Sequence, residues 1–556
     1  MKVHSPPRQP FAQSGVDGFM EVIEITLGLL LAVALIAAIA KWVPVPVPLL
    51  LVAGGILLSY IPGVREFSIP PEVFFMLFIP PLLFSDGWLI PKRDLLSALR
   101  PVLLHAFGLV FLTVIVVGYL MHWLIPELPL AAAFALGAVI SPTDAVAVSA
   151  ITGELKLPSR VTAIVNGESL INDASGLVAF KFAVAAVVTG VFSWSGAVVQ
   201  FFVLSIGGFA LGLAIAWVIG HLRIHLKRFC VIDPTIQTVF SLLTPYAAYL
   251  AAERIGVGSI LAVVAAGLYA GVHDARHLDG PTRNHAWEVW TMLLFAFNGL
   301  VFLLLGVQVH SIVAGVSRAS FGEVAGYALA LSATVIVVRL LWVFPAAMLP
   351  PLLSKRIFAS EGMRDPRLIF LTGWAGIRGS VTMAAALSIP LVTASGAPFP
   401  GRDLIILLAA SVIVVTLLLN GMTLPLVIRT LQIHGDGMAE REERAARIAT
   451  AQAAIDALQK QVSHLTHADE IAYAKSLIAH YEQRSRRYSA NADRRRHLDS
   501  MDESHRRIWM AAVNAERNEL MQMHEGDEIN DEVLRLLQTG IDVEEALIVG
   551  ATRRGH

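Results

Sequence analysis

Three charged side chains interrupt one long apolar stretch of this chain, between residues 159 and 190. They are Glu168, Asp173 and Lys181. Each charge at the centre of a membrane helix costs about 2.5–3.5 kcal/mol on insertion scales. Acidic groups that a sequence retains at such a cost usually handle ions or protons. This stretch is therefore the first candidate for a functional site.

Helical periodicity sorts the polar side chains of this stretch onto two neighbouring faces. Ser169 and Asp173 are four positions apart and share one face, while Glu168 and Asn172 share the next. A bare alkali cation prefers several hard oxygen ligands, and a carboxylic acid removed from water also holds a proton readily. We expect Asp173 to bind either a cation or a proton, and this competition alone would couple the two fluxes.

Two further apolar segments carry residues that break helices. Pro142 lies within Ile140-Ser141-Pro142-Thr143-Asp144, and three glycines at a spacing of three lie within Gly373-Trp374-Ala375-Gly376-Ile377-Arg378-Gly379-Ser380. Interrupted helices in corresponding halves of a transporter mark its binding site near the middle of the membrane. Unwound helices expose partial charges at their ends, and we expect Asp144 to balance one such end and Arg378 another.

These breaks and the acidic stretch together give a predicted set of cation ligands. The set is made of carboxylate, hydroxyl and carbonyl oxygens, from Asp173, Asp144, Ser169 and Thr143. These residues would bind Na⁺ as transported substrate, with Asn172 in support. No histidine or cysteine lies near the acids, which argues against a transition metal.

The remaining buried charges need partners or a route to water. We expect Glu168 to form a structural ion pair with Arg378, because an unpaired guanidinium at that depth is costly. Arg339 is expected to extend to the cytoplasmic surface. Lys181 either extends in the same way or faces an interface between domains, and its role stays open.

Composition sets the class of protein. The chain has 556 residues, of which 56% are hydrophobic and 15% charged, whereas a soluble domain has roughly 25% charged residues. Apolar runs of about 20 residues predict membrane helices and not a β-barrel. The net charge of −1 says nothing about partners, and no nucleic-acid partner is expected; the single Cys230 excludes an intrachain disulfide.

We therefore predict an all-α polytopic membrane protein with about 13 transmembrane helices. The apolar segments are 22–42, 46–62, 70–90, 98–123, 129–151, 159–190, 197–220, 235–254, 256–273, 288–311, 322–349, 366–391 and 403–430. The excess of Lys and Arg in alternate connections places the N-terminus outside and the C-terminus in the cytoplasm. The first helix is expected to be retained, not cleaved as a signal peptide.

Three regions follow from this pattern. They are an N-terminal extramembrane segment (1–21), a transmembrane domain (22–430) and a polar, helical cytoplasmic tail (431–556) with a regulatory role. In the tail, Ile455, Leu458, Val462 and Leu465 form an apolar stripe expected to pack within the tail. A second tail helix is expected through Glu532–Leu537, with Gly540 as its stop.

At these motifs the sequence resembles the monovalent cation:proton antiporter-1 family, which includes bacterial NhaP antiporters and animal sodium/proton exchangers. The resemblance covers about residues 22–430. The motifs that carry it are Phe78-Ile79-Pro80-Pro81-Leu82-Leu83-Phe84, Ser141-Pro142-Thr143-Asp144-Ala145-Val146-Ala147-Val148, Asn166-Gly167-Glu168-Ser169-Leu170-Ile171-Asn172-Asp173, Phe302-Leu303-Leu304-Leu305-Gly306-Val307 and Gly376-Ile377-Arg378-Gly379-Ser380.

The resemblance implies an NhaA-like inverted-repeat antiporter fold with crossed, unwound helices, a core part and a dimerisation part. It implies homodimers and an elevator-like motion of the core. It makes Asp173 the cation- and proton-binding carboxylate, joined by Asp144, Thr143 and Ser169, with Glu168 paired to Arg378. Asn172 before Asp173 matches the electroneutral branch, which exchanges one cation for one proton. Pro142 lies before Asp144 here, whereas some relatives have proline after the aspartate.

The expected function is exchange of Na⁺, or Li⁺ or K⁺, for H⁺ across the cell (inner) membrane, without a cofactor. Membrane lipid and an unidentified ligand of the tail are the other expected partners. A K⁺/H⁺ antiporter of the same fold and a cation channel are the alternatives that stay open. An intramembrane enzyme is disfavoured, because the sequence has no Gly-x-Gly-Asp protease motif and no metal-ligand pair on a helix.

Overall fold

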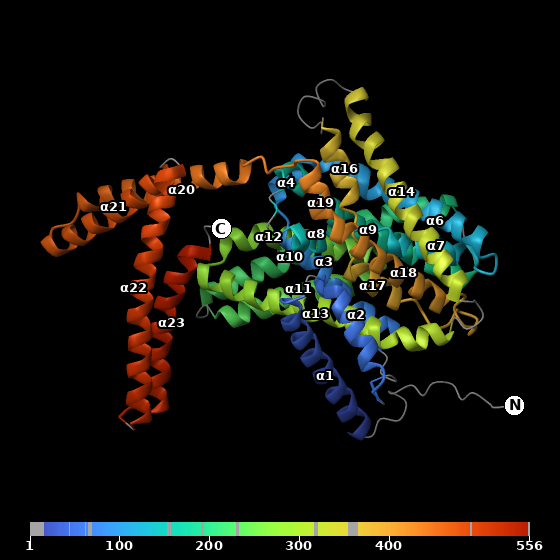
Figure 1. Cartoon of the computed structure of the whole chain (residues 1–556), viewed down its shortest axis with the longest axis horizontal. Coiled ribbons are helices and arrows are strands. Elements are labelled where there is room, and N and C mark those ends of the chain that lie inside the picture. Colours follow the sequence, from blue (N-terminus) through green and yellow to red (C-terminus); the bar gives the residue numbers. More distant parts are fainter. Residues whose placement is uncertain are drawn as a thin grey trace. The chain divides into compact units, whose positions relative to one another are not determined.

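A computed structural model describes most of the chain. The described residues are 16–43, 45–61, 63–64, 69–152, 155, 157–190, 194–229, 233–315, 321–353, 365–489, 492–526 and 528–553. They form helices joined by short connections, as Figure 1 shows. The chain divides into two compact units, Met1–Asp436 and Gly437–His556, and each is described by itself.

The first half of the larger unit ends with the helix that carries the acidic stretch. Its elements are α1 (Val16–Ala40), α2 (Val47–Leu58), α3 (Pro71–Leu89), α4 (Lys92–Ser97), α5 (Leu99–Leu103), the π-helix η1 (Leu104–Leu109), α6 (Val110–Leu124), α7 (Leu130–Ile140), α8 (Ala145–Thr152) and α9 (Ser159–Thr189). Proline in the first turn of α2 and α3 costs no hydrogen bond, because a first-turn N–H has no helical acceptor. Gly190 ends α9 with φ of 71°, a left-handed conformation that suits glycine.

The second half of this unit contains the other interrupted segment. Its elements are α10 (Trp194–Phe229), α11 (Pro234–Ile255), α12 (Ser259–His277), α13 (Gly280–Gly315), α14 (Phe321–Leu353), α16 (Pro366–Trp374), α17 (Ser380–Leu387), α18 (Arg402–Thr416), the π-helix η2 (Leu417–Gly421) and α19 (Met422–Thr430). The segment predicted at 366–391 is thus two short helices, α16 and α17, separated by the glycine-rich break.

Nine stretches of the described residues are long and apolar enough to cross a membrane. The other four predicted segments are also helical, but they do not meet both criteria. Segment 46–62 contains the 12-residue α2, segment 366–391 contains two short helices, and α11 and α12 are less apolar. The structure is therefore that of an all-helical polytopic membrane protein with nine candidate spans, fewer than the 13 predicted. α1 begins at Val16, inside the segment predicted as extramembrane, and its candidate span begins at Ile23.

Glycines let several helix pairs approach at backbone distance. A Cβ built on Gly306 of α13 would lie 2.8 Å from the Cα of Gly55 on α2, so neither position tolerates a side chain. Gly208 of α10 lies in the same way against the backbone of Gly258, which precedes α12. Small residues at such crossings allow close packing where lipid supplies no hydrophobic drive between helices.

The described residues of the smaller unit form four helices, α20 (Met438–Val462), α21 (Ala468–Ser489), α22 (Ala492–Glu525) and α23 (Asp531–Arg553). α20 packs against α21, where Arg447 donates to the Tyr488 hydroxyl at 2.9 Å, and Ile455 of the predicted stripe is buried. α23 continues through Gly540, so the predicted helix stop is wrong. A glycine inside a helix costs only about 1 kcal/mol relative to alanine.

Candidate functional site

The two interrupted segments are bonded to each other at their breaks. α7 ends at Ile140 and α8 begins at Ala145, while α16 ends at Trp374 and α17 begins at Ser380. In the gaps, the Asp144 N–H donates to the Ile377 carbonyl at 2.8 Å. Backbone groups that the breaks remove from helices therefore find partners across the crossing.

Asp144 and Arg378 lie at helix ends of opposite partial charge. Asp144 Oδ1 accepts from the Val146 N–H at 2.8 Å and the Ala147 N–H at 3.1 Å, which caps the N-terminus of α8. Arg378 Nε donates to the Ile140 carbonyl at 3.1 Å, at the C-terminus of α7. Each charge thus balances one of the helix ends that the breaks expose, Asp144 an N-terminus and Arg378 a C-terminus.

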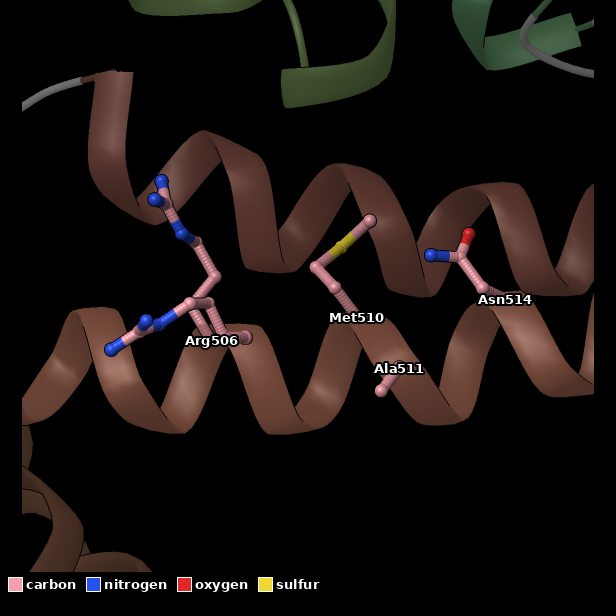
Figure 2. Close-up of a pocket in the computed structure, with 5 residues that line it drawn as sticks. Arg506, Met510, Ala511 and Asn514 are labelled. Atoms are coloured by element: carbon pink, nitrogen blue, oxygen red, sulfur yellow. The ribbon is translucent and has the colours of Figure 1, made fainter.

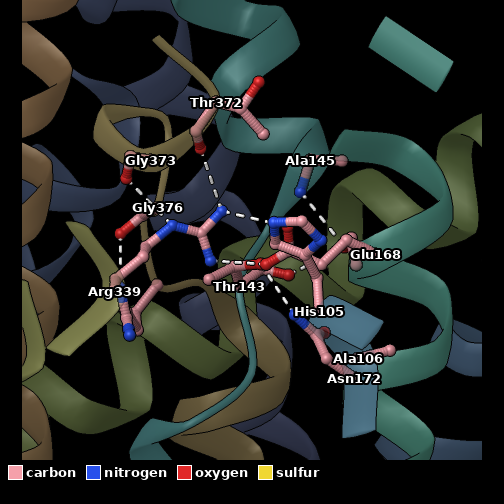
Figure 3. Close-up of polar contacts among 12 residues, drawn as sticks. His105, Ala106, Thr143, Ala145, Glu168, Asn172, Arg339, Thr372, Gly373 and Gly376 are labelled. Atoms are coloured by element: carbon pink, nitrogen blue, oxygen red, sulfur yellow. Dashed lines mark hydrogen bonds and ion pairs between the residues drawn. The ribbon is translucent and has the colours of Figure 1, made fainter. Parts of the chain in front are cut away.

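α9 holds the first break through its polar face. The Ser169 hydroxyl donates to the Thr143 carbonyl at 2.7 Å and accepts from the Ala145 N–H at 3.2 Å. Asn172 Nδ2 donates to the Thr143 hydroxyl at 2.8 Å, a contact that Figure 3 shows. Of the predicted ligands, Ser169 and Thr143 are therefore in contact, together with the supporting Asn172, and the oxygens of Thr143 are already bonded to α9.

Asp173 is buried, with 4% of its surface exposed. Within the described part of the chain, it forms no hydrogen bond or ion pair, and its electrostatic neighbours are the carboxylates of Asp144 and Asp86. Asp86 belongs to α3 and is half-buried, as is Asp144. Asp173 is thus a buried acid without a partner in the described structure, under the repulsive charge of two other acids, and a cation or proton at Asp173 would relieve that repulsion.

Asp86 is a residue that the sequence analysis missed. Its signal was an acid within the apolar segment 70–90, the same signal that identified Asp173. Among the described residues, no three His, Cys, Asp or Glu side chains are close enough to hold one metal ion together. Binding of a cation at Asp173 would therefore depend on hydroxyl and carbonyl oxygens as well as carboxylates.

Glu168 pairs with Arg339 of α14, and this corrects the predicted Glu168–Arg378 pair. The Arg339 guanidinium donates to both carboxylate oxygens, with Nη2–Oε2 at 3.1 Å. It also donates to the Gly373 carbonyl at 2.9 Å and the Thr372 carbonyl at 3.1 Å, and Figure 3 shows these contacts. The predicted extension of Arg339 to the cytoplasm is also wrong, since its exposed fraction is 2%. Arg339 is held inside because the end of α16 offers carbonyls that have no helical donor.

His105 is a second group that the sequence analysis missed. It lies in the π-helix η1, is 3% exposed and donates from Nδ1 to the Pro101 carbonyl at 2.7 Å. Its electrostatic neighbours are Glu168 and Arg339. The imidazole therefore adds a third polar group beside the buried ion pair, at an irregular turn of the kind that π-helices supply.

The tail carries a pocket of its own. Its volume is about 450 Å³. Figure 2 shows that the residues lining it lie on α22. The lining residues are Arg506, Arg507, Met510, Ala511 and Asn514. The pocket shares no residue with the site around Asp173.

Comparisons with known proteins agree with these features. Residues 29–430 match the family described as "Sodium/hydrogen exchanger, transmembrane". The chain is 38% identical to a sodium, potassium, lithium and rubidium/H⁺ antiporter of Bacillus subtilis, over 96% of this chain and 79% of that one. It is 37% identical to the uncharacterized Na⁺/H⁺ exchanger YjcE of Escherichia coli, over 95% of this chain and 99% of that one.

Among solved structures, the fold is similar to that of the sodium proton antiporter MjNhaP1 from Methanocaldococcus jannaschii. The TM-score is 0.59 at 20% identity, over 74% of this chain and 99% of that one. At that identity the likeness concerns the fold alone. The family match spans both interrupted segments and α9, so it covers every residue of the site. The chain is a transporter and not an enzyme, and it belongs to the sodium/hydrogen exchanger family, of the NhaP type within the monovalent cation:proton antiporter-1 group.

Proposed function

We propose that this antiporter exchanges one monovalent cation for one proton at Asp173, by exposing that carboxylate to each side of the membrane in turn. The single observation that carries the proposal is the burial of Asp173 without a fixed partner, beside Asp144 and at the crossing of two broken helices. A carboxylate in that position binds H⁺ or a cation, but not both. If the empty charged site crosses the membrane poorly, competition for one acid is sufficient for coupled exchange.

The cation would be held by Asp173, Asp144, Ser169 and the Thr143 carbonyl. The Ser169 hydroxyl already donates its hydrogen to that carbonyl at 2.7 Å. A hydroxyl oxygen also has two lone pairs, so Ser169 could bind the cation while it keeps this hydrogen bond. Asn172 supports the site through its bond to the Thr143 hydroxyl. Na⁺ is the proposed substrate, with K⁺ and Li⁺ as further substrates, as the name of the Bacillus subtilis relative suggests.

A stoichiometry of one to one follows from the charge of the groups at Asp173. The residue before Asp173 is Asn172, whose side-chain amide is neutral and donates a hydrogen bond to the Thr143 hydroxyl. An acid at that place, as in the electrogenic branch of the family, would add a further titrating group to Asp173, Asp144 and Asp86 and a place for a further proton. We infer that each cycle moves no net charge.

The arrangement of the whole protein is proposed on the same footing. We infer a homodimer in the cell (inner) membrane, with the N-terminus outside and the tail in the cytoplasm. The thirteen predicted segments, including α2, α11, α12 and the α16–α17 pair, would then cross the membrane as an NhaA-like inverted repeat. The segment 431–556 would be the regulatory tail.

The test is proton flux in proteoliposomes of the full chain, after addition of Na⁺, Li⁺ or K⁺ in turn. The chain should exchange at least one of these cations, and Asp173→Asn should exchange none while remaining folded. Undiminished exchange by Asp173→Asn would remove Asp173 from the mechanism. Net current during turnover at a clamped potential would contradict the one-to-one stoichiometry.

A K⁺/H⁺ antiporter of the same fold is the second candidate, and the potassium in the name of the Bacillus subtilis relative favours including it. The same flux assay separates the two, because a potassium antiporter would respond to K⁺ and not to Na⁺. A channel would instead give a current far above carrier turnover that does not require a proton gradient.

A further inference from the structure

Lys181 lies about two turns after Asp173 on α9 and bonds residues of other helices. Its ammonium pairs with Glu253 near the end of α11. It also donates at 3.0 Å to the hydroxyl of Ser259, the first residue of α12. That hydroxyl donates in turn to Glu253 at 2.6 Å, so the three side chains form a closed set of contacts.

Two aromatic rings complete the surroundings of this lysine. Nζ lies 5.4 Å from the ring centre of Phe75 on α3 and 5.4 Å from that of Tyr249 on α11, within the range of a cation–π contact. The side chains of Lys181 and Glu253 are nevertheless 40% and 43% exposed. The contacts therefore hold Lys181 in one place, while the ion pair stays solvated enough to break at a modest cost.

The partners of Lys181 lie on α11 and α12, which bond chiefly to helices other than α9, although α12 also packs directly against α9. α9 is bonded to η1, where the Ser175 hydroxyl donates to the Ala106 carbonyl at 2.7 Å, and to the break after α7. α11 and α12 are bonded instead to α13 and α10, through Trp290 to Ser241 at 3.1 Å and the Gly258 N–H to a carbonyl of α10 at 2.9 Å. Lys181 thus ties the helix that carries Asp173 to the α10–α13 group.

We propose that Lys181, Glu253 and Ser259 form a gate that closes the outer side of the site and opens once in each transport cycle. This inference rests on the proposed exchange at Asp173 and on the proposed topology, which places the end of α9 outside. To expose Asp173 to each side of the membrane in turn, the outer end of α9 must change the helices that it contacts. The lysine contacts are among those that must part there, and while they are formed they favour the state closed to the outside.

Loss of the gate should shift apparent affinities in opposite directions on the two sides. Apparent affinity scales with the fraction of protein in the binding-competent state. In sided vesicles of the full chain, Lys181→Met should lower the apparent KM for external Na⁺ and raise that for internal Na⁺, each by about two- to fivefold, the range expected for a solvated ion pair. Glu253→Gln should give the same shifts, the double variant no more, and Lys181→Arg much smaller ones.

A cross-link tests whether the contact must open. Cysteines at 181 and 253 are introduced in a Cys230→Ser background, which removes the single native cysteine. Oxidation should stop Na⁺-dependent proton flux and reduction should restore it, while either cysteine alone should be unaffected by oxidation. Full exchange by cross-linked protein would overturn the gate.

The failure of the gate can be told from failure of the proposed function. If the Cys230→Ser parent exchanges no cation, the proposed function fails; if it exchanges while the cross-linked pair does too, only the gate fails. If the two cysteines do not cross-link, the sided measurements decide. Equal shifts of the apparent KM for external and internal Na⁺, or no shift, would show that the Lys181 contacts persist throughout the cycle, and would reject the gate.

Discussion

The guanidinium of Arg339 binds both carboxylate oxygens of Glu168 and also the carbonyls at the end of α16. Glu168 precedes Ser169, which bonds the other break through Thr143. One buried ion pair therefore joins α9 and α14 to the second interrupted segment, α16–α17. The adjacent residue of α9, Ser169, bonds the first interrupted segment, α7–α8. Substitution of either residue of this pair should disturb both breaks, because the break after α7 is bonded to α9 and the end of α16 is bonded to Arg339 of α14.

The first prediction concerns the choice of partner for Glu168. Removing one member of a buried ion pair leaves the other charge uncompensated, so Glu168→Gln and Arg339→Gln should each lower the free energy of unfolding by about 3–5 kcal/mol. The double variant should lose clearly less than the sum of the two, as measured by unfolding in detergent. The matched control is the Glu168 and Arg378 pair of substitutions, whose losses should be closer to additive. A larger coupling for Arg378 than for Arg339 would contradict the structure.

Asp144 caps α8 and is a proposed cation ligand, and a pair of substitutions can separate the two roles. Asparagine is also a good helix cap, so Asp144→Asn should keep the bonds to Val146 and Ala147 while removing the charge. We expect near-normal stability and an apparent cation affinity reduced roughly tenfold or more. Asp144→Ala should in addition lose about 0.5–2 kcal/mol of stability with the cap. Equal stability losses for the two variants would argue against the capping role.

Asp86 should attract the cation without being indispensable. It is half-buried and acts on Asp173 through its charge, so Asp86→Asn should raise the apparent KM for Na⁺ by about two- to tenfold. The effect should be larger at low ionic strength, where charges are less screened. Asp94→Asn is the control, because Asp94 is exposed on the neighbouring α4, and it should change the KM little. Complete loss of exchange in Asp86→Asn would instead make Asp86 an essential ligand.

The close approach of α2 and α13 predicts a contrast between two glycines. In Gly306→Ala the added carbon meets backbone atoms of Val52 and Gly55, which cannot move aside independently. We expect a loss of about 1–3 kcal/mol from overpacking. Gly326→Ala on α14 is the control, since that position has open space around it, and it should be neutral or stabilising by up to about 1 kcal/mol. Thermal unfolding in detergent measures both.

Several features of the site were predictable because their causes are local. The helical repeat puts Ser169 and Asp173 on one face whatever the surroundings are. Pro142 and the glycines around Arg378 interrupt their helices through backbone chemistry alone. Charges close to such breaks then act on the nearest helix ends, so Asp144 and Arg378 each bond one, although the sequence did not say which end each would meet.

Helix count and partner choice were less predictable. Apolar content marks a segment as membrane-embedded, but α2 and the α16–α17 pair are too short for the length criterion that a full span meets. Arg339 and Arg378 both lie in apolar segments, and nothing in the sequence says which of them reaches Glu168. Asp86 and His105 carried the same kind of signal as Asp173, without neighbours in the chain that would reveal a shared site.

The sequence by itself determined the class of protein, its family, and which face of α9 carries the acid, since hydropathy, motif and helical period act over a few turns of one segment. The tertiary structure decided that Arg339 holds Glu168, that the charge of Asp86 acts on Asp173 and that Lys181 binds Glu253. Those contacts join helices far apart in the chain, and the buried partner of a charge depends on which helices pack together. Packing is a property of the whole fold, so no single segment could specify it.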